Sequence, residues 1–488
     1  MQIPLLSGIY TDDVANVRVA YPRNLMPVTL DSGVSDGYLR RAEGIQEWTV
    51  YPFEGADRGG IEWRGVLYRV VGNDFCSFDS GGNKTVIGSA PGQDHVRFDY
   101  SFDKLAFRSS GNLYLYDGTT FQQVTDTDLG VVRDFLWVDG YFLTTDGNFL
   151  VVTELNNPFS VDPFKYGSSE YDSDDVMAVL KLRNEVYALN RHTIEAFNNV
   201  GGEGFPFQRI EGAVIPKGVI GTNACAVFMN AIAFLGGGRN ESNSIWIGIN
   251  GNCEKLSTRQ IDEILAGYTE DVLASVQFET RTYKGAELLY IHLPDQTLVY
   301  DATCSKAAQR PVWFTLTTSL DGLGMYRARN FVWCYDKWIV GDPITRTQDF
   351  PPYNQGRLGY MTDEYLVHYT EPVGWEFSTK MIYNESRGAI VHQLELVSLS
   401  GRLPQMELYQ QNEETVFSAY SSDGITWSQP RSARAGKFGE TNKRIVFFGM
   451  GLFRNYRIQK FWGGTLNYAF SARLAFLRLE AQIEPLAV

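Results

Sequence analysis

Seven β-hairpin signals recur between residues 65 and 340, and they constrain the fold more than any other feature of the chain. Each joins two short apolar or aromatic runs through a tight-turn sequence, such as the Asp117-Gly118 pair that follows Asn112-Leu-Tyr-Leu-Tyr116. Asp-Gly and Asn-Gly supply the positive-φ residues that tight hairpin turns need. The turns fall at residues 72, 117, 146, 190, 250, 294 and 336.

The spacing of these turns predicts a β-propeller. They are on average about 44 residues apart, and a period of ~40–50 residues with a hairpin in each unit is typical of propeller blades. The step from 117 to 146 is short and the step from 190 to 250 is long, which leaves open an incomplete blade or an insertion. We expect six to seven blades. The alternative is an all-β protein with irregularly spaced hairpins.

Proline and glycine residues between 343 and 372 predict a boundary between two structural units. Beyond it, apolar and polar residues alternate with period two, as in 391–399, which predicts an antiparallel β-sandwich. The expected organisation is an N-terminal extended segment at 1–55, a β-propeller at 56–345, a linker at 346–374 and a C-terminal β-sandwich at 375–488.

One helix is expected inside this β-rich chain, over residues 257–266. It begins with hydroxyl residues suited to an N-cap, places Ile261, Ile264 and Leu265 at helical spacing, and is followed by Gly267. We expect the helix to pack against a blade and to have a structural role.

Composition argues against several classes of protein. The net charge of −14 disfavours a sequence-independent grip on DNA, because an acidic surface repels phosphates. The five cysteines are scattered and contain no Cys-x-x-Cys pair, so neither a zinc site nor a disulfide framework is expected. The first residues lack the basic and apolar regions of a signal peptide, and no apolar stretch is long enough to predict a membrane span.

No constellation of catalytic or ligand-binding residues stands out. None of the five histidines pairs with another at metal-ligand spacing, and His292 lies in an apolar strand, which favours a packed or hydrogen-bonded role. The acidic run Asp172-Ser-Asp174-Asp175 lacks the distal glutamate of a calcium loop and is interpreted as solvated. We expect no catalytic residue, no cofactor, no metal and no enzymatic activity.

The sharpest single motif is Ser421-Ser-Asp-Gly-Ile-Thr-Trp427. It approximates the Asp-box of sialidases, a turn that is structural and not catalytic even there. The motif occurs once and is one residue short, and Asp-Gly followed by an aromatic residue is also a good hairpin turn. A glycan-binding or sialidase-like propeller of a tail enzyme is therefore kept as the alternative function.

Several segments resemble, in order, the tail-hub proteins of short-tailed Salmonella-type podoviruses, also called packaged DNA stabilisation proteins. The closest similarity is Glu287-Leu-Leu-Tyr-Ile-His-Leu-Pro294 followed by Leu298-Val-Tyr-Asp-Ala302. The other similar segments lie at 35–45, 58–70, 193–222, 423–425 and 443–455. Their collinearity is more specific than any one motif, whereas residues 343–372 fit the family poorly.

The resemblance implies a structural tail hub, or nozzle. Such a protein would form a homo-oligomeric ring, expected to be a hexamer, below the portal-adaptor ring. It would continue the DNA channel, anchor the tail needle, adjoin the tailspikes and retain packaged DNA. DNA would pass through the channel without sequence-specific binding. The implied location is the virion tail, after assembly in the host cytoplasm.

Overall fold

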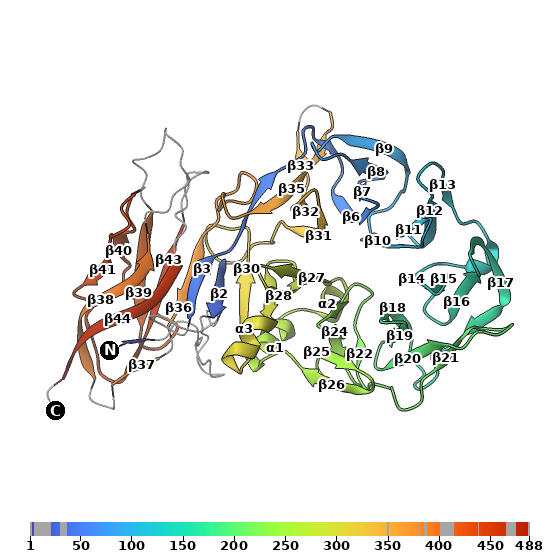
Figure 1. Cartoon of the computed structure of the whole chain (residues 1–488). Helices are drawn as coiled ribbons and strands as arrows, with labels where there is room; N and C mark the ends of the chain where they lie inside the picture. Colours follow the sequence, from blue (N-terminus) through green and yellow to red (C-terminus); the bar gives the residue numbers. More distant parts are fainter. Residues whose placement is uncertain are drawn as a thin grey trace.

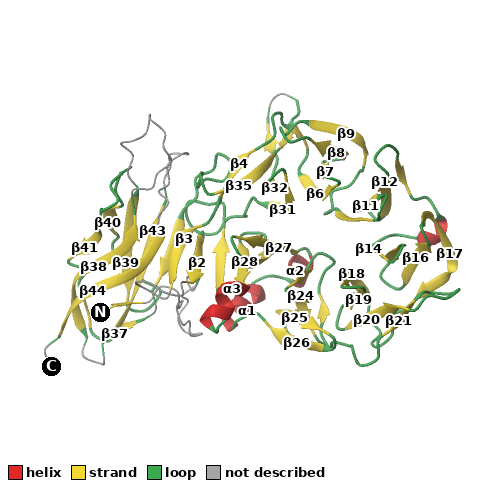
Figure 2. Ribbon diagram, viewed as in Figure 1, coloured by secondary structure: helices red, strands yellow, loops and turns green. Residues whose placement is uncertain are grey.

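The computed structural model describes residues 2–3, 21–29, 37–348, 351–379, 381–384, 388–400, 414–437, 439–464 and 475–486. Within these ranges the chain forms a ring of small antiparallel sheets beside a two-sheet sandwich (Figures 1 and 2). We number the sheets of the ring blades 1 to 7 in chain order.

Blades 1 to 4 are four-stranded meanders in which consecutive strands pair. Blade 1 contains β6 (Asp57–Trp63), β7 (Val66–Val71), β8 (Asp74–Phe78) and β9 (Lys84–Ser89). Blade 2 contains β10 (Arg97–Tyr100), β11 (Leu105–Ser109), β12 (Asn112–Tyr116) and β13 (Phe121–Gln123). Blade 3 contains β14 (Asp134–Val138), β15 (Tyr141–Thr145), β16 (Leu150–Glu154) and β17 (Asn157–Gly167), with the 3-10 helix η1 (Thr127–Leu129) before it. Blade 4 contains β18 (Val176–Leu182), β19 (Glu185–Asn190), β20 (Ile194–Asn199) and β21 (Phe207–Arg209).

Blades 5 to 7 complete the ring. Blade 5 contains β22 (Gly218–Val219), β23 (Cys225–Phe228), β24 (Ala231–Gly237), β25 (Ser244–Ile249) and β26 (Asn252–Lys255). Blade 6 contains β27 (Gln277–Tyr283), β28 (Ala286–His292), β29 (Thr297–Asp301) and β30 (Trp313–Leu316). Blade 7 contains β31 (Arg329–Cys334), β32 (Lys337–Gly341), β35 (Leu358–Thr362) and β4 (Gly44–Glu47). A small sheet of β33 (Arg346–Thr347), β34 (Asn354–Gly356) and β5 (Phe53–Glu54) lies beside blade 7.

All seven predicted hairpins are present, one in each blade. Val71 pairs with Asp74 around the first turn, for example, and Tyr116 pairs with Phe121 around the second. The turns occupy different positions within their blades: the turn at 117 joins the third and fourth strands, whereas the turn at 146 joins the second and third. The uneven steps follow from this shift, so no blade is incomplete, and the blade number is seven.

The N-terminal residues close the propeller. Strand β4 is the outer strand of blade 7 and pairs antiparallel with β35, with Gly44 opposite Thr362 and Glu47 opposite Gly359. The structure therefore differs from the expected boundaries, because residues assigned to the N-terminal segment (1–55) and to the linker (346–374) build a blade. The pairing partner of β4 lies more than 300 residues away, so no local sequence signal marked it.

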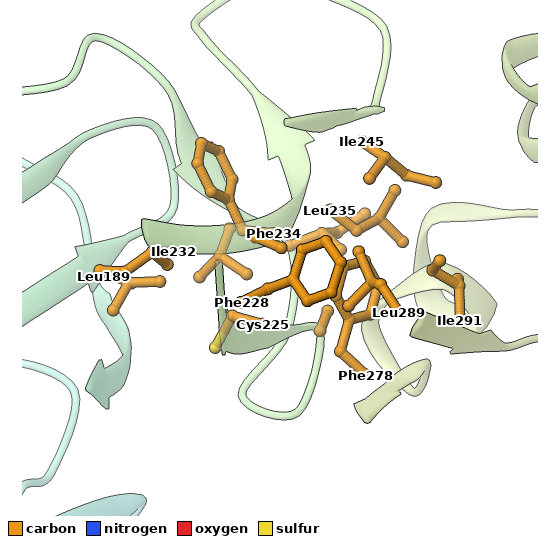
Figure 3. Close-up of a cluster of buried hydrophobic side chains, with 14 of the residues drawn as sticks. Leu189, Cys225, Phe228, Ile232, Phe234, Leu235, Ile245, Phe278, Leu289 and Ile291 are labelled. Atoms are coloured by element: carbon orange, nitrogen blue, oxygen red, sulfur yellow. The ribbon is translucent and has the colours of Figure 1, made fainter. Parts of the chain in front are cut away.

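The predicted helix is confirmed as α1 (Arg259–Ala266), with Thr258 as N-cap and Gly267 as C-cap. Together with α2 (Glu270–Ala274) it fills the connection between blades 5 and 6. Ile261 and Leu265 are fully buried and belong to the largest apolar core, which extends from blade 4 to blade 6. Figure 3 shows the centre of this core, where side chains from three blades gather around β24. A third helix, α3 (Ala302–Ala308), follows β29.

The sandwich contains two facing sheets. The first contains β1 (Gln2–Ile3), β2 (Leu25–Thr29), β3 (Gly37–Arg41), β38 (Ala389–Leu399), β41 (Ile445–Phe448), β42 (Leu452–Phe453) and β44 (Ala475–Pro485). The second contains β36 (Trp375–Ser378), β37 (Ile382–Tyr383), β39 (Thr415–Ser421), β40 (Arg431–Arg434) and β43 (Tyr456–Gly463). Aromatic side chains fill the space between them, and the rings of Trp375 and Phe476 are 4.6 Å apart. Strands β1 to β3 come from the expected N-terminal segment, which is thus divided between the sandwich and the propeller.

Candidate functional site: the propeller axis and its surroundings

Acidic side chains on the inner strands join neighbouring blades. Asp99 of β10 accepts the backbone N–H of Trp137 in β14 at 2.6 Å, and Asp134 of β14 accepts that of Val179 in β18 at 2.8 Å. Glu279 of β27 likewise accepts the N–H of Phe331 in β31 at 2.9 Å. Each bond satisfies an inner-strand amide that lacks a partner within its own blade, so these carboxylates fix the blades relative to one another.

A buried ion pair holds blade 1 against blade 7, where the ring closes. The Asp57 carboxylate accepts from the Arg69 guanidinium at 2.8 Å and from the Asn330 side-chain amide at 2.6 Å. Arg69 also donates to the backbone carbonyls of Asn330 and Ile339. Both charged side chains are completely buried. Removing one partner would leave the other as an uncompensated charge.

The propeller axis contains a cavity of about 190 Å³. Its lining comes from blades 1, 2, 6 and 7 and includes Gly60, His95, Arg97, Gln277, Glu279 and Phe331. Burial lowers the pKa of His95 to about 4 and raises that of Glu279, so His95 is neutral at pH 7. The cavity is smaller than the ~300–1,000 Å³ of typical small-molecule sites.

His292 borders this region from β28. It is buried, and its ring nitrogens lie 2.9 Å from the Thr297 hydroxyl and 2.8 Å from the Glu279 carboxylate. Burial lowers its pKa well below the usual value. The predicted hydrogen-bonded, packed role of His292 is confirmed.

The acidic run of residues 172–175 lies in the loop between β17 and β18. Asp172 forms an ion pair with Arg239 at 2.7 Å, and Asp174 accepts the backbone N–H of His192 at 2.6 Å. Nowhere in the described ranges do three or more His, Cys, Asp or Glu side chains converge in a way that could hold a metal ion.

The Asp-box-like turn lies in the sandwich, between β39 and β40, and not in a propeller blade. The Asp423 carboxylate accepts the N–H groups of Ile425 and Thr426, both at 2.8 Å, and also the Thr426 hydroxyl. These hydrogen bonds lower the pKa of Asp423. Gly424 has a φ of +75°, as the turn requires. Asp423 therefore caps a tight turn.

Buried polar contacts hold the N-terminal residues within the sandwich and against the propeller. Arg41 of β3 forms an ion pair with Glu414 at 3.3 Å, and the Trp375 indole N–H donates to the same carboxylate at 2.7 Å. Asn24, which precedes β2, donates to the Gly374 carbonyl at 2.7 Å and accepts the N–H of Thr317, just after β30, at 2.9 Å. Arg41 thus joins the two sheets of the sandwich, whereas Asn24 connects the N-terminal residues to the propeller at Thr317. Neither contact had a signal in the local sequence pattern.

Among the described helices, none combines the length and the apolar character needed to cross a membrane.

Seven antiparallel blades, the last of them completed by an N-terminal strand, are followed by a sandwich and define a propeller–sandwich protein. The chain belongs to the bacteriophage P22 Gp10 family: the family's β-propeller part matches residues 1–348 and its β-sandwich part matches residues 374–484. The resemblance found in the sequence and the predicted fold class are both confirmed.

One relative is the tail hub protein gp10 of Salmonella phage P22. It is 27% identical over 363 residues, which cover 70% of this chain and 74% of the relative. Among solved structures, the Pan2 WD40 domain of Neurospora crassa is 11% identical with a TM-score of 0.38, covering 62% of this chain and 89% of its own. Hsv2 of Kluyveromyces lactis is 9% identical with a TM-score of 0.34, covering 66% and 99%.

Proposed function

We propose that this chain is a structural tail hub of a short-tailed phage, with no catalytic role. The observation that carries the proposal is that both parts of the Gp10 family, propeller and sandwich, match in order along nearly the whole chain. A relative that bears the name tail hub protein supports the same role.

The geometry favours a ring of several copies, with a hexamer as the expected number. The DNA path is proposed to lie between copies and not through a blade ring, and the small cavity of about 190 Å³ near the propeller axis agrees with this. A net charge of −14 suits a wall that lets DNA slide past without holding it. The ring would continue the channel below the portal-adaptor ring, anchor the tail needle, adjoin the tailspikes and retain packaged DNA. It would act in the virion tail after assembly in the host cytoplasm.

Electron microscopy of tails assembled with this chain tests the proposal. We expect density for the chain in a ring around the tail axis, between the adaptor ring and the needle. Tails lacking the chain should leak packaged DNA, measured as nuclease-sensitive DNA in purified particles. A position away from the axis, or particles that keep their DNA without the chain, would contradict a hub.

A glycan-cleaving or glycan-binding propeller has less support. The Asp423 carboxylate is occupied by hydrogen bonds within its own turn and belongs to the sandwich. Release of sugar from host glycans by the purified chain, lost on substitution of one carboxylate, would favour that alternative over the hub.

A further inference from the structure

Opposite charges gather at the two ends of the molecule. Residues 126–175, in and around blade 3, contain eleven acidic and two basic residues, whereas residues 431–454 of the sandwich contain six basic and one acidic residue. Figure 1 places β17 of blade 3 at one end of the molecule and β40 and β41 of the sandwich at the other. The asymmetry is therefore a spatial one and not only a property of the sequence.

The acidic end presents exposed aromatic side chains. We call β17, with the flanking turns at 146–149 and 168–175, the acidic edge. Phe164 is 85% exposed, Tyr171 60% and Tyr166 52%, and the Tyr166 ring contacts that of Phe149. A hollow of about 320 Å³ lies between the two turns. The acidic residues of these turns are Asp146, Glu170, Asp172, Asp174 and Asp175, of which Asp172 pairs with Arg239 and Asp175 with Arg133.

Strand β17 is suited to an edge contact. It is the last strand in the order of its sheet, and its pairing with β16 is interrupted by register shifts around Val151 and Thr153. Seven of the 25 large apolar side chains that are exposed in the described ranges lie between residues 126 and 175. A group of exposed apolar side chains bordered by charged residues more often marks an interaction surface than a surface that only faces solvent.

The basic end combines the edges of both sandwich sheets. We call β40, β41 and residues 449–454 the basic edge. Strands β40 and β41 end their respective sheets and lie beside each other. Phe448 is 65% exposed and Leu452 is 52% exposed. Around them lie the exposed basic side chains Arg431, Arg434, Lys437, Lys443, Arg444 and Arg454.

We propose that the acidic edge of one copy docks on the basic edge of the next, so that identical chains join head to tail. Complementary charges would steer and orient the encounter, and the exposed apolar side chains at the centre of each edge would supply anchors. Contacts between two different surfaces of one chain generate a ring when their rotation closes. The inference rests on the proposed hub function and names the surfaces that build its ring.

A second copy fits these edges better than other occupants, because both complementary surfaces belong to the same chain. DNA is disfavoured at the acidic edge by repulsion between carboxylates and phosphates. The basic edge alone could receive phosphate, but its exposed Phe448 and Leu452 match an apolar protein surface.

Zero-length carbodiimide cross-linking tests the contact directly, in the full-length chain and in assembled tails. We expect isopeptide bonds between Lys437 or Lys443 and the acidic residues of the 168–175 turn. Mixing isotope-labelled and unlabelled chains shows that these bonds join different copies. Their lack in assembled tails, or bonds from these lysines only to another tail protein, would overturn the inference.

Paired variants test whether the contact is head to tail. Phe164→Ala with Glu170→Gln weakens the acidic edge, and Phe448→Ala with Lys443→Gln weakens the basic edge. All four side chains are exposed, so the fold is expected to persist. Each double variant should self-associate about tenfold or more weakly than the unmodified chain in sedimentation equilibrium. An equimolar mixture of the two should form dimers and nothing larger, because each retains one intact edge.

A matched control removes one apolar and one acidic side chain elsewhere, Leu323→Ala with Glu254→Gln, both exposed. It should associate like the unmodified chain. If the edge variants also associate normally, the named surfaces are wrong while a hub ring still stands. If electron microscopy places the chain away from the tail axis, the proposed function itself fails, whatever the edge variants do.

Discussion

At the scale of single residues, the propeller depends on charged groups in places where water cannot reach them. Asp57 with Arg69 is the sharpest case, because both side chains are completely buried and each satisfies the other. Such a pair adds little stability compared with well-packed apolar residues. Removing one partner, however, strongly lowers the free energy of unfolding, because the other charge stays buried without a partner. The pair also bridges blades 1 and 7, so its loss would weaken the point where the ring closes.

Asp57→Ala should lower the free energy of unfolding by about 3–5 kcal/mol, because it leaves Arg69 buried without a counter-charge. Urea denaturation measures the change. Asp103→Ala is the control: Asp103 pairs with Lys104 but is largely exposed, and it should change stability by no more than about 1 kcal/mol. Equal losses for the two variants would contradict a special role for the buried pair.

His95 should make the protein less stable in mild acid. Its folded-state pKa of about 4 lies below the ordinary value of 6.5, so between these pH values the unfolded chain binds a proton that the folded chain does not. Its contribution to stability is complete above pH 6.5 and falls as the pH drops toward 4.

In that pH window, unfolding of the unmodified chain is accompanied by the uptake of about one proton at His95. His95→Gln removes this uptake and should therefore flatten the pH dependence of the free energy of unfolding. Urea denaturation at several pH values measures the slope. Gln122→Asn, a change of a non-titrating side chain at an exposed position of blade 2, should leave the slope unchanged. A slope that His95→Gln does not alter would mean that the folded protein does not hold His95 in its neutral form.

At the scale of secondary-structure elements, the hairpins of the blades could be predicted from the sequence. The closure of the propeller by β4 could not. Asp117-Gly118 and Asn250-Gly251 predict tight turns from the local sequence, because those residue pairs favour the backbone angles that such turns require. Strand β4 is only four residues long, and its partner β35 lies in a stretch rich in turn formers. Its assignment depends on a long-range pairing that no short-range pattern contains.

The acidic edge and the basic edge were likewise predictable only in part. The charge runs at 126–175 and 431–454 can be read from the printed sequence. That they occupy opposite ends of the molecule follows only from how the blades and the sandwich are arranged. The axial cavity is a similar case, because Glu279 of blade 6 joins Gly60 and His95, which lie more than 180 residues earlier in the chain.

Gly44→Val should detach β4 from blade 7. A Cβ at Gly44 would lie 2.1 Å from the backbone oxygen of Tyr365, which cannot move away as a flexible side chain could. We expect loss of hydrogen-exchange protection in β35 and destabilisation of about 3 kcal/mol or more, because overpacking against backbone forces the strand out.

Gly204→Val is the matched control for Gly44→Val, since a Cβ there meets nothing within 4 Å. It should leave protection in β35 intact. Normal protection of β35 in Gly44→Val would show that blade 7 is stable without its N-terminal strand.

At the scale of the whole molecule, the net charge determines how the isolated chain should behave toward DNA. The net charge is −14, and the cavity near the propeller axis has a volume of only about 190 Å³. If the chain contributes to a channel, that channel has to be a property of the assembly. Its wall would be formed by surfaces that do not bind phosphate strongly.

The isolated chain should therefore show no measurable affinity for duplex DNA, with a Kd weaker than about 100 μM even at low salt. Fluorescence anisotropy with a labelled duplex measures this at ~50 mM salt, where electrostatic binding is strongest. A cationic protein of similar size serves as the positive control. Salt-sensitive binding by the chain would contradict a passive wall and would point to the basic edge as its source.

The closure of blade 7 by β4 has a consequence for how the protein is made. At ~5–20 residues per second, roughly 15 to 60 seconds separate the synthesis of residue 47 from that of residue 362, which completes its partner strand. During translation, β4 has to remain available while six blades form beside it. The ring can close only when nearly three quarters of the chain has been synthesised, so interrupted translation would yield propellers whose seventh blade is incomplete.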